Sequence, residues 1–201
     1  MPGVADLDLL LASTSRYRRE LLARLGIPFR TRPPACDEEA LKDRRLTPQA
    51  LSELLAMAKA RSLEAAEPQA TIIGSDQVAA LQDGDTWLIL GKPGTAVAAT
   101  DQLERLNGRT HLLFTAMAVL HRGSVHAHTD ITTLTMRRLG REQLARYVEA
   151  DQPLDCAGAY KLEAHGISLF ASIDSRDHSA ITGLPLIALA AHLASLGYPI
   201  P

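Results

Sequence analysis

The chain of 201 residues alternates between two patterns of apolar and polar positions. Short apolar and β-branched runs, which are typical of buried strands, stand between longer stretches in which apolar residues recur at helical spacing. The short runs predict strands over Leu7–Ala12, Thr71–Gly74, Val78–Leu81, Thr86–Leu90, His111–His121, Val125–Leu134 and Ile167–Ile173. The helical spacing predicts helices over Ser15–Gly26, Pro48–Ala66, Ala96–Leu106, Arg141–Ala150 and Leu184–Leu196. This interleaving favours a mixed α/β fold.

The connecting segments carry recognisable turn chemistry. Gly26 is expected at the C-cap of the first helix, and Thr47 is expected to cap the second. Pro28–Pro34 is predicted to be extended, and Ala35–Thr47 to form a polar, acid-rich loop. Since no internal repeat or low-complexity linker interrupts residues 1–201, we expect one domain.

Composition narrows the class of protein. A hydrophobic content of 46% with 22% charged residues is ordinary for a soluble globular domain. The net charge of -2 argues against a general nucleic-acid surface, which needs a basic excess. No apolar run reaches the ~20 residues that cross a bilayer, and Asp6 and Asp8 precede the first apolar run, unlike a signal peptide. Cys36 and Cys156 lack metal-ligand spacing. We therefore expect a cytoplasmic protein with free thiols and with no nucleic-acid or membrane partner.

The first predicted helix begins with three cations. Arg16, Arg18 and Arg19 follow the turn Ser13–Ser15. A helix N-terminus is already positive, so each cation there is disfavoured by roughly 0.3–1 kcal/mol. A bound phosphate chain, held also by backbone N–H groups, would account for this placement. The alternative is an amphipathic helix with solvated arginines.

Further charged residues fall at strand ends and in loops. Asp76 follows the apolar run over Thr71–Gly74, Asp37 and Glu38 stand in the acid-rich loop, and Lys59 interrupts an apolar helix face. Lys92 stands in a Gly-Lys-Pro loop. Carboxylates that hold a hard divalent ion, with cations that neutralise a leaving phosphate, suit phosphoanhydride hydrolysis. Neither GxxxxGK[ST] nor GxGxxG is present.

The sequence resembles the Maf family of nucleotide pyrophosphatases. The matching segments are LASTSRYRRELLARLGI, CDEE, LAMAKA, IIGSDQV, GKP, CAGAYKLEAHG and GLPLIAL, in that order from about Leu9 to Leu189. The resemblance implies hydrolysis of a nucleoside triphosphate to the monophosphate and pyrophosphate with a divalent cation, Mg²⁺ or Mn²⁺. It also implies an elongated central mixed sheet flanked by helices, with two lobes and a cleft, as in inosine triphosphate pyrophosphatases. A homodimer is plausible by the same resemblance.

The resemblance also assigns roles to individual residues. Asp76 takes the position of the general base, and Glu38 and Asp76 are the expected metal ligands. The expected phosphate-binding residues are Ser13, Arg18, Arg19, Lys59 and Lys92. The chain departs from the family at Arg16, which replaces the proline of the usual Ser-Pro-Arg-Arg order, so the first helical turn loses a preset φ.

Tyr17, Gln77 and Glu163 resemble the branch of the family that acts on 7-methyl-GTP and so keeps modified nucleotides out of nucleic acids. Methylated guanine is cationic, and a tyrosine ring attracts such a base by ~0.5–2 kcal/mol. Glu163 can accept its N1–H and N2–H. The alternatives are an exposed Tyr17 with a surface Glu163, a pyrophosphatase for dTTP, UTP or other modified nucleotides, and a nucleotide-binding regulator of septum formation.

One polar loop stays without a catalytic role. It contains Asp174, Arg176, Asp177 and His178 and precedes Gly183-Leu184-Pro185. We expect it to shape the edge of a lobe, the alternative being a direct substrate contact.

Overall fold

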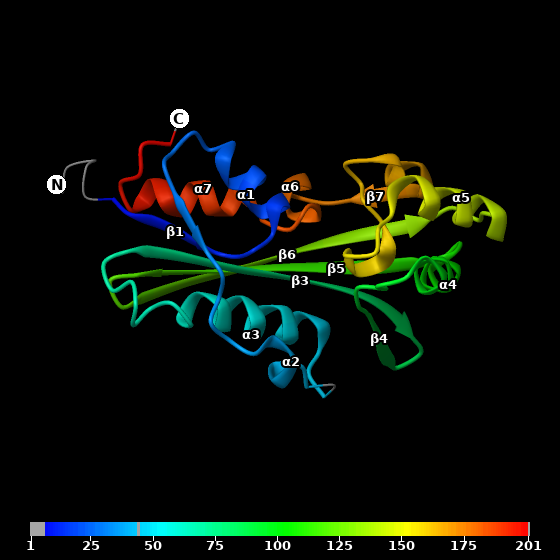
Figure 1. Ribbon diagram of the computed structural model, residues 1–201, viewed down its shortest axis with the longest axis horizontal. Coiled ribbons are helices and arrows are strands. Elements are labelled where there is room, and N and C mark those ends of the chain that lie inside the picture. Colours follow the sequence, from blue (N-terminus) through cyan, green and yellow to red (C-terminus); the bar gives the residue numbers. More distant parts are fainter. Residues whose placement is uncertain (1–6, 44, 201) are drawn as a thin grey trace. The chain divides into compact units, whose positions relative to one another are not determined.

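The computed structural model describes residues 7–43 and 45–200 and shows a mixed α/β fold (Figure 1). Its strands are β1 (Leu9–Ala12), β2 (Arg30–Arg32), β3 (Thr71–Asp83), β4 (Thr86–Leu90), β5 (Thr110–His121), β6 (Ser124–Met136) and β7 (Phe170–Asp174). Its α-helices are α1 (Arg16–Ala23), α2 (Glu38–Leu41), α3 (Pro48–Arg61), α4 (Ala96–Leu106), α5 (Arg141–Asp151), α6 (His178–Ile181) and α7 (Leu186–Ser195). Two short 3₁₀ helices are η2 (Ala157–Ala159) and η3 (His165–Leu169).

The strands form a mixed sheet. Its order is β2-β1-β3-β5-β6-β7, and β4 pairs with β3. β1 is parallel to both β2 and β3, whereas β3–β4 and β6–β7 are antiparallel. Within the described residues, no helix is long and apolar enough to cross a membrane. The prediction of an α/β fold with a central mixed sheet flanked by helices is confirmed.

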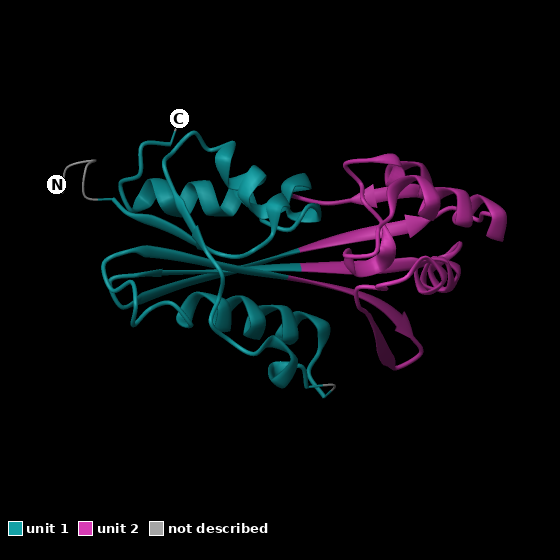
Figure 2. Cartoon of the chain, in the orientation of Figure 1, with its two compact units in different colours: residues 1–76, 115–130, 177–201 teal, residues 77–114, 131–176 magenta. Residues whose placement is uncertain are grey.

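The chain divides into two compact units (Figure 2). Unit 1 holds the described residues of Met1–Asp76, Thr115–Asp130 and Asp177–Pro201, and unit 2 holds Gln77–Phe114 and Ile131–Arg176. The strands β3, β5 and β6 each contribute residues to both units.

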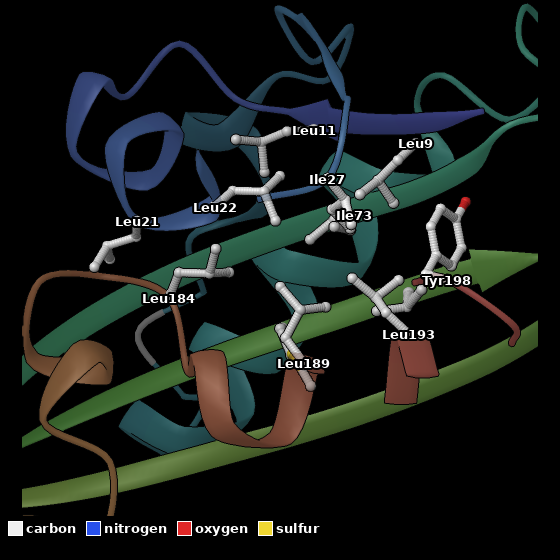
Figure 3. Close-up of a cluster of buried hydrophobic side chains, with 12 residues drawn as sticks. Leu9, Leu11, Leu21, Leu22, Ile27, Ile73, Leu184, Leu189, Leu193 and Tyr198 are labelled. Carbon is white, nitrogen blue, oxygen red and sulfur yellow. The ribbon is translucent and has the colours of Figure 1, made fainter. Parts of the chain in front are cut away.

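Unit 1 buries apolar side chains on both faces of its sheet. Helices α1 and α7 cover one face and α3 covers the other (Figure 1). Because side chains alternate along a strand, β1 serves both faces: Leu9 and Leu11 pack with the helices α1 and α7, while Leu10 and Ala12 pack with α3. The larger cluster contains Leu9, Leu11, Leu21, Leu22, Ile27, Ile73, Met117, Val119, Leu184, Leu189, Leu193 and Tyr198 (Figure 3).

Unit 2 contains the hairpin β3–β4, helices α4 and α5, and two sets of aromatic contacts. Trp87 of β4 meets Phe114 edge to face, with ring centroids 6.0 Å apart. His111 Nε2 lies 2.9 Å from the Tyr160 hydroxyl, and the Tyr160 ring packs edge to face on Phe170.

Five predictions of local structure are wrong. The segment after Thr71–Gly74 does not break the strand, because β3 continues through Ser75 and Asp76 to Asp83. The predicted loop Ala35–Thr47 contains α2, which Asp37 caps by accepting from the amides of Glu39 and Ala40. Three further elements end or begin elsewhere: α1 ends at Ala23 with Arg24 as its C-cap, α3 ends at Arg61, and β7 begins only at Phe170.

Gly26 is not the C-cap of α1. The helix ends three residues earlier through 3₁₀-type bonds, in which the amide of Arg24 reaches the carbonyl of Leu21. Gly26 nevertheless adopts a φ of +69°, so it still provides the left-handed residue that reverses the chain after the helix.

Candidate active site

Helix α3 packs closely against strand β3, and this packing brings Lys59 next to Asp76. A Cβ atom on Gly74 would lie 2.2 Å from the carbonyl oxygen of Ala56 and 2.6 Å from the amide nitrogen of Ala60. Only glycine allows α3 to lie this near β3. Gly74 and Asp76 face the same side of the strand. The approach therefore brings Lys59 of α3 to Asp76, with Nζ 2.5 Å from Oδ1.

Lys59 joins two carboxylates. Its side chain is only 6% exposed, and Nζ also lies 3.0 Å from Oε2 of Glu38, in the first turn of α2. Asp76 is buried as well. Asp37, whose side chain caps α2, holds the helix that carries Glu38. Glu38, Lys59 and Asp76 thus form one compact cluster, in which the buried ammonium of Lys59 is paired with two carboxylates.

The start of α1 forms a polar hollow. Ser15 caps the helix by accepting from the amide of Arg18, and Ser13 Oγ accepts from the amide of Ser15 at 3.1 Å. A cavity of about 260 Å³ is lined by Ser13, Thr14, Ser15, Arg19, Thr31 and Pro33. A helix N-terminus with hydroxyl groups and an arginine suits an anion. The predicted phosphate-binding residues Ser13 and Arg19 therefore share one cavity.

Arg18 points from α1 toward the loop before α7. Its Nε donates to the carbonyl oxygen of Gly183 at 2.9 Å. Burial lowers the pKa of Arg18, and the nearby charges of Asp76 and Glu38 raise it. The guanidinium stays charged, since its ordinary pKa lies far above neutral. The structure of unit 1 thus brings Arg18 into the electrostatic range of the carboxylate cluster.

Residues on both faces of the sheet can contribute to the site because β1 is short. Leu11 of β1 pairs with Ile73 of β3, and β1 ends one residue later, whereas β3 continues. Ser75 and Asp76 therefore lie beyond the end of β1. By strand alternation Ser75 faces the α1 side and Asp76 the α3 side, in agreement with their contacts to Gly183 and Lys59.

Tyr17 already binds a cation in this chain. The Arg16 guanidinium carbon lies 4.7 Å from the centre of the Tyr17 ring, and Arg16 Nη2 donates to the Tyr17 hydroxyl at 3.1 Å. The ring is half-buried. The prediction for a methylated base depends on an attraction of the same kind, with the cationic base in place of the Arg16 guanidinium.

The remaining predicted residues belong to unit 2 (Figure 2). Gln77 directly follows Asp76 on β3 and is half-buried. Lys92 is exposed in the loop after β4, and Glu163 is exposed in the turn before η3. The carboxylate of Glu163 and the ammonium group of Lys92 are therefore accessible to a ligand.

The fit of a divalent cation depends on the donor set. Among residues 7–43 and 45–200, no group of three or more His, Cys, Asp or Glu side chains could hold a metal ion. Mg²⁺ commonly takes one or two carboxylates together with substrate phosphates and water. Glu38 and Asp76 each place one oxygen on Lys59 and have a second oxygen outside these ion pairs. Two hard oxygen donors of this kind fit Mg²⁺ or Mn²⁺ that is shared with a phosphate chain.

Sequence reasoning missed two residues of this site. Ser75, fully buried, places Oγ 2.8 Å from the Ala116 carbonyl oxygen and 3.0 Å from that of Gly183. Gly183 has a φ of +116°. The signals in the sequence were the polar Ser75 between Gly74 and Asp76 and the position of Gly183 at the start of the family segment GLPLIAL.

Comparison with known proteins gives one consistent picture. A family model described as "Maf-like protein" matches residues 8–196. The 7-methyl-GTP pyrophosphatase of Bdellovibrio bacteriovorus is 48% identical over 90% of this chain and 93% of that protein. The 7-methyl-GTP pyrophosphatase of Aromatoleum aromaticum is 45% identical, covering 96% of this chain and 97% of its own. That of Pseudomonas putida is 44% identical, over 97% and 100%. A HAM1 protein from Coxiella burnetii shares 15% identity over 66% of this chain and 74% of its own, with a TM-score of 0.41, too weak a similarity to inform the fold.

Proposed function

Because the chain belongs to the Maf family, whose model spans residues 8–196, we propose that it hydrolyses 7-methyl-GTP to 7-methyl-GMP and pyrophosphate. Relatives that are 44–48% identical over nearly their whole length bear the name of this activity. The observation that carries the proposal is the cluster of Asp76, Lys59 and Glu38, which lies within the same unit as Arg18. We also propose that the enzyme acts in the cytoplasm on the free nucleotide.

Asp76 is the general base of the proposed reaction. It takes a proton from water as the water oxygen bonds to the α-phosphorus. The bond from that phosphorus to the oxygen bridging the α- and β-phosphates breaks, and pyrophosphate leaves with the electron pair. Positioned proton transfer contributes roughly 10²–10⁴-fold to such rates. The ammonium of Lys59, 2.5 Å from Asp76 Oδ1, fixes the carboxylate in place.

Two arginines of α1, the hydroxyl group of Ser13 and the ammonium of Lys92 bind the phosphates. Arg18 and Arg19 neutralise the charge that accumulates on the departing pyrophosphate, and Ser13 donates to it from the cavity wall. Lys92 adds a cation from its exposed loop. A divalent cation held by Glu38 and Asp76 would, when bound, neutralise further charge on the phosphate chain.

Tyr17, Gln77 and Glu163 select the base. The Tyr17 ring attracts a cationic face, as its contact with Arg16 illustrates, and 7-methylguanine is cationic. The Glu163 carboxylate accepts the two N–H groups of guanine's pairing edge, whereas thymine and uracil present carbonyl oxygens to it. A site built around such hydrogen bonds rejects a mismatched base strongly.

The test is pyrophosphate release with Mg²⁺ or Mn²⁺ from 7-methyl-GTP, GTP, dTTP, UTP and CTP. We expect the highest kcat/KM for 7-methyl-GTP and its loss in Asp76→Asn. Asp101→Asn is the matched control, because Asp101 is an exposed residue of α4 that pairs with Arg141. Preference for a pyrimidine would refute the assigned substrate. Nucleotide binding without turnover would instead favour a regulatory protein.

A further inference from the structure

Two buried polar side chains brace the loop between α6 and α7. Asp177 Oδ1 accepts from the Ser179 amide at 2.9 Å, and Oδ2 accepts from the Ile187 amide at 2.8 Å. Ser179 Oγ lies 2.5 Å from Asp177 Oδ1 and 3.0 Å from the Leu184 carbonyl oxygen, and accepts from the Leu186 amide at 2.9 Å. Asp177 and Ser179 are each 4% exposed. These contacts tie the backbone of Leu184, Leu186 and Ile187, directly after Gly183, to one carboxylate and one hydroxyl group.

The braced segment presents one carbonyl group to the site. The oxygen of Gly183 accepts from Arg18 Nε at 2.9 Å and lies 3.0 Å from Ser75 Oγ. The φ of Gly183, +116°, is a conformation that other residues adopt only with strain. Three features therefore restrain the position of this oxygen: the contacts of Asp177 and Ser179 with the following residues, the hydroxyl group of Ser75, and the backbone conformation of Gly183.

Nε of Arg18 donates to a neutral carbonyl oxygen rather than to a carboxylate. Among the described residues, Arg18 forms no ion pair within 4.0 Å, in contrast to Lys59 with its two carboxylates. Guanidinium is a rigid planar fork, so a hydrogen bond that holds Nε restricts the orientation of the whole group. The N–H groups of Nη1 and Nη2 then keep a fixed direction in which to meet a phosphate.

We propose that Asp177 and Ser179 are positioning residues for Arg18, acting through the carbonyl group of Gly183, so that the guanidinium is preorganised to bind the pyrophosphate part of the substrate. The proposal rests on the function proposed above and assigns a task to the loop before α7. Preorganised donors are effective because they need no rearrangement at the moment of reaction.

The test is a double-mutant cycle read by binding of inorganic pyrophosphate, measured by calorimetry with Mg²⁺, and by kcat and KM for 7-methyl-GTP. Ser179→Ala should weaken pyrophosphate binding and lower kcat/KM, each by about tenfold, the scale of a hydrogen bond to a charged group. In an Arg18→Lys background the same change should have no further effect, because lysine has no Nε–H to orient. Ser52→Ala is the matched control: Ser52 is buried on α3 and bonds within its own helix, to the Gln49 carbonyl oxygen.

Thermal melting of each variant separates positioning from loss of fold. Ser75→Ala removes a different support of the same carbonyl group, and should show the same dependence on Arg18. The proposal is wrong if Ser179→Ala leaves pyrophosphate binding intact, if its effect is equal in both backgrounds, or if the wild-type protein does not bind pyrophosphate. Pyrophosphate binding with the expected cycle but no triphosphate turnover would refute the proposed function alone.

Discussion

The close approach of α3 to β3 makes Gly74→Ala the most informative perturbation of the site. The new methyl group would lie 2.2 Å from the Ala56 carbonyl oxygen and 2.6 Å from the Ala60 amide nitrogen, and both are backbone atoms that no rotamer change can move. The helix must shift away from the strand. Overpacking of this kind lowers the free energy of unfolding by about 1–3 kcal/mol.

The same shift carries Lys59 away from Asp76, since Lys59 directly precedes Ala60 on the helix. A displacement of about 1 Å in a catalytic group can lower the rate by about 100-fold. We therefore expect Gly74→Ala to fold, to lose about 1–3 kcal/mol of stability in urea unfolding, and to lose roughly 100-fold in kcat for 7-methyl-GTP.

Gly84→Ala is the control for this experiment. Gly84 has a φ of +60° in the β3–β4 turn, and nothing lies within 4 Å of the position its Cβ would take. This variant should lose about 1–2 kcal/mol from backbone strain and keep its kcat. If Gly74→Ala retained wild-type kcat, the argument that this contact positions Lys59 on Asp76 would be refuted.

Three further predictions concern single side chains. Asp76→Asn should lower kcat by at least 100-fold with unchanged circular dichroism, and retention of even a tenth of the activity would exclude Asp76 as the base. Glu163→Gln should reduce the ratio of kcat/KM for 7-methyl-GTP to that for GTP without changing Tm, because Glu163 is exposed. Burial lowers the pKa of His111 to about 4. Below pH 6.5 the unfolded chain therefore binds a proton that the folded chain does not, and stability should fall by on the order of 3 kcal/mol toward pH 4. His111→Gln should remove that loss in urea titrations at pH 7 and pH 4.5.

Much of the fold could be predicted from the sequence because local patterns and tertiary packing agree. The helix over Ala96–Leu106 and the strand over Thr86–Leu90 have the predicted bounds. Each has clear signals at its ends, a threonine cap for the helix and the Asp83-Gly84 turn for the strand. The continuous strand β3 was not predictable in this way: Gly74 and Ser75 suggest a break, and only the packing of α3 and the carbonyl groups of Ala116 and Gly183 explain why they stay in the strand.

The sequence pointed to the charged residues of the candidate site but not to the groups that hold them in position. Motifs indicated Asp76, Lys59, Glu38 and Arg18, and unit 1 brings these four together. The role of Gly183 could not be predicted, because a backbone carbonyl group has no side-chain signature and its partner Arg18 is 165 residues away in sequence. The roles assigned to these four charged residues, and to Gln77, Lys92 and Glu163 in unit 2, stay predictions.

The position of bond cleavage tests the central claim most directly. The enzyme is incubated with 7-methyl-GTP and Mg²⁺ in water enriched in oxygen-18, and the products are analysed by mass spectrometry beside an Asp76→Asn control. The account predicts 7-methyl-GMP carrying one oxygen-18 atom and unlabelled pyrophosphate, with both products formed at least 100-fold more slowly by the variant. Release of 7-methyl-GDP with phosphate, or label in the pyrophosphate, would contradict it.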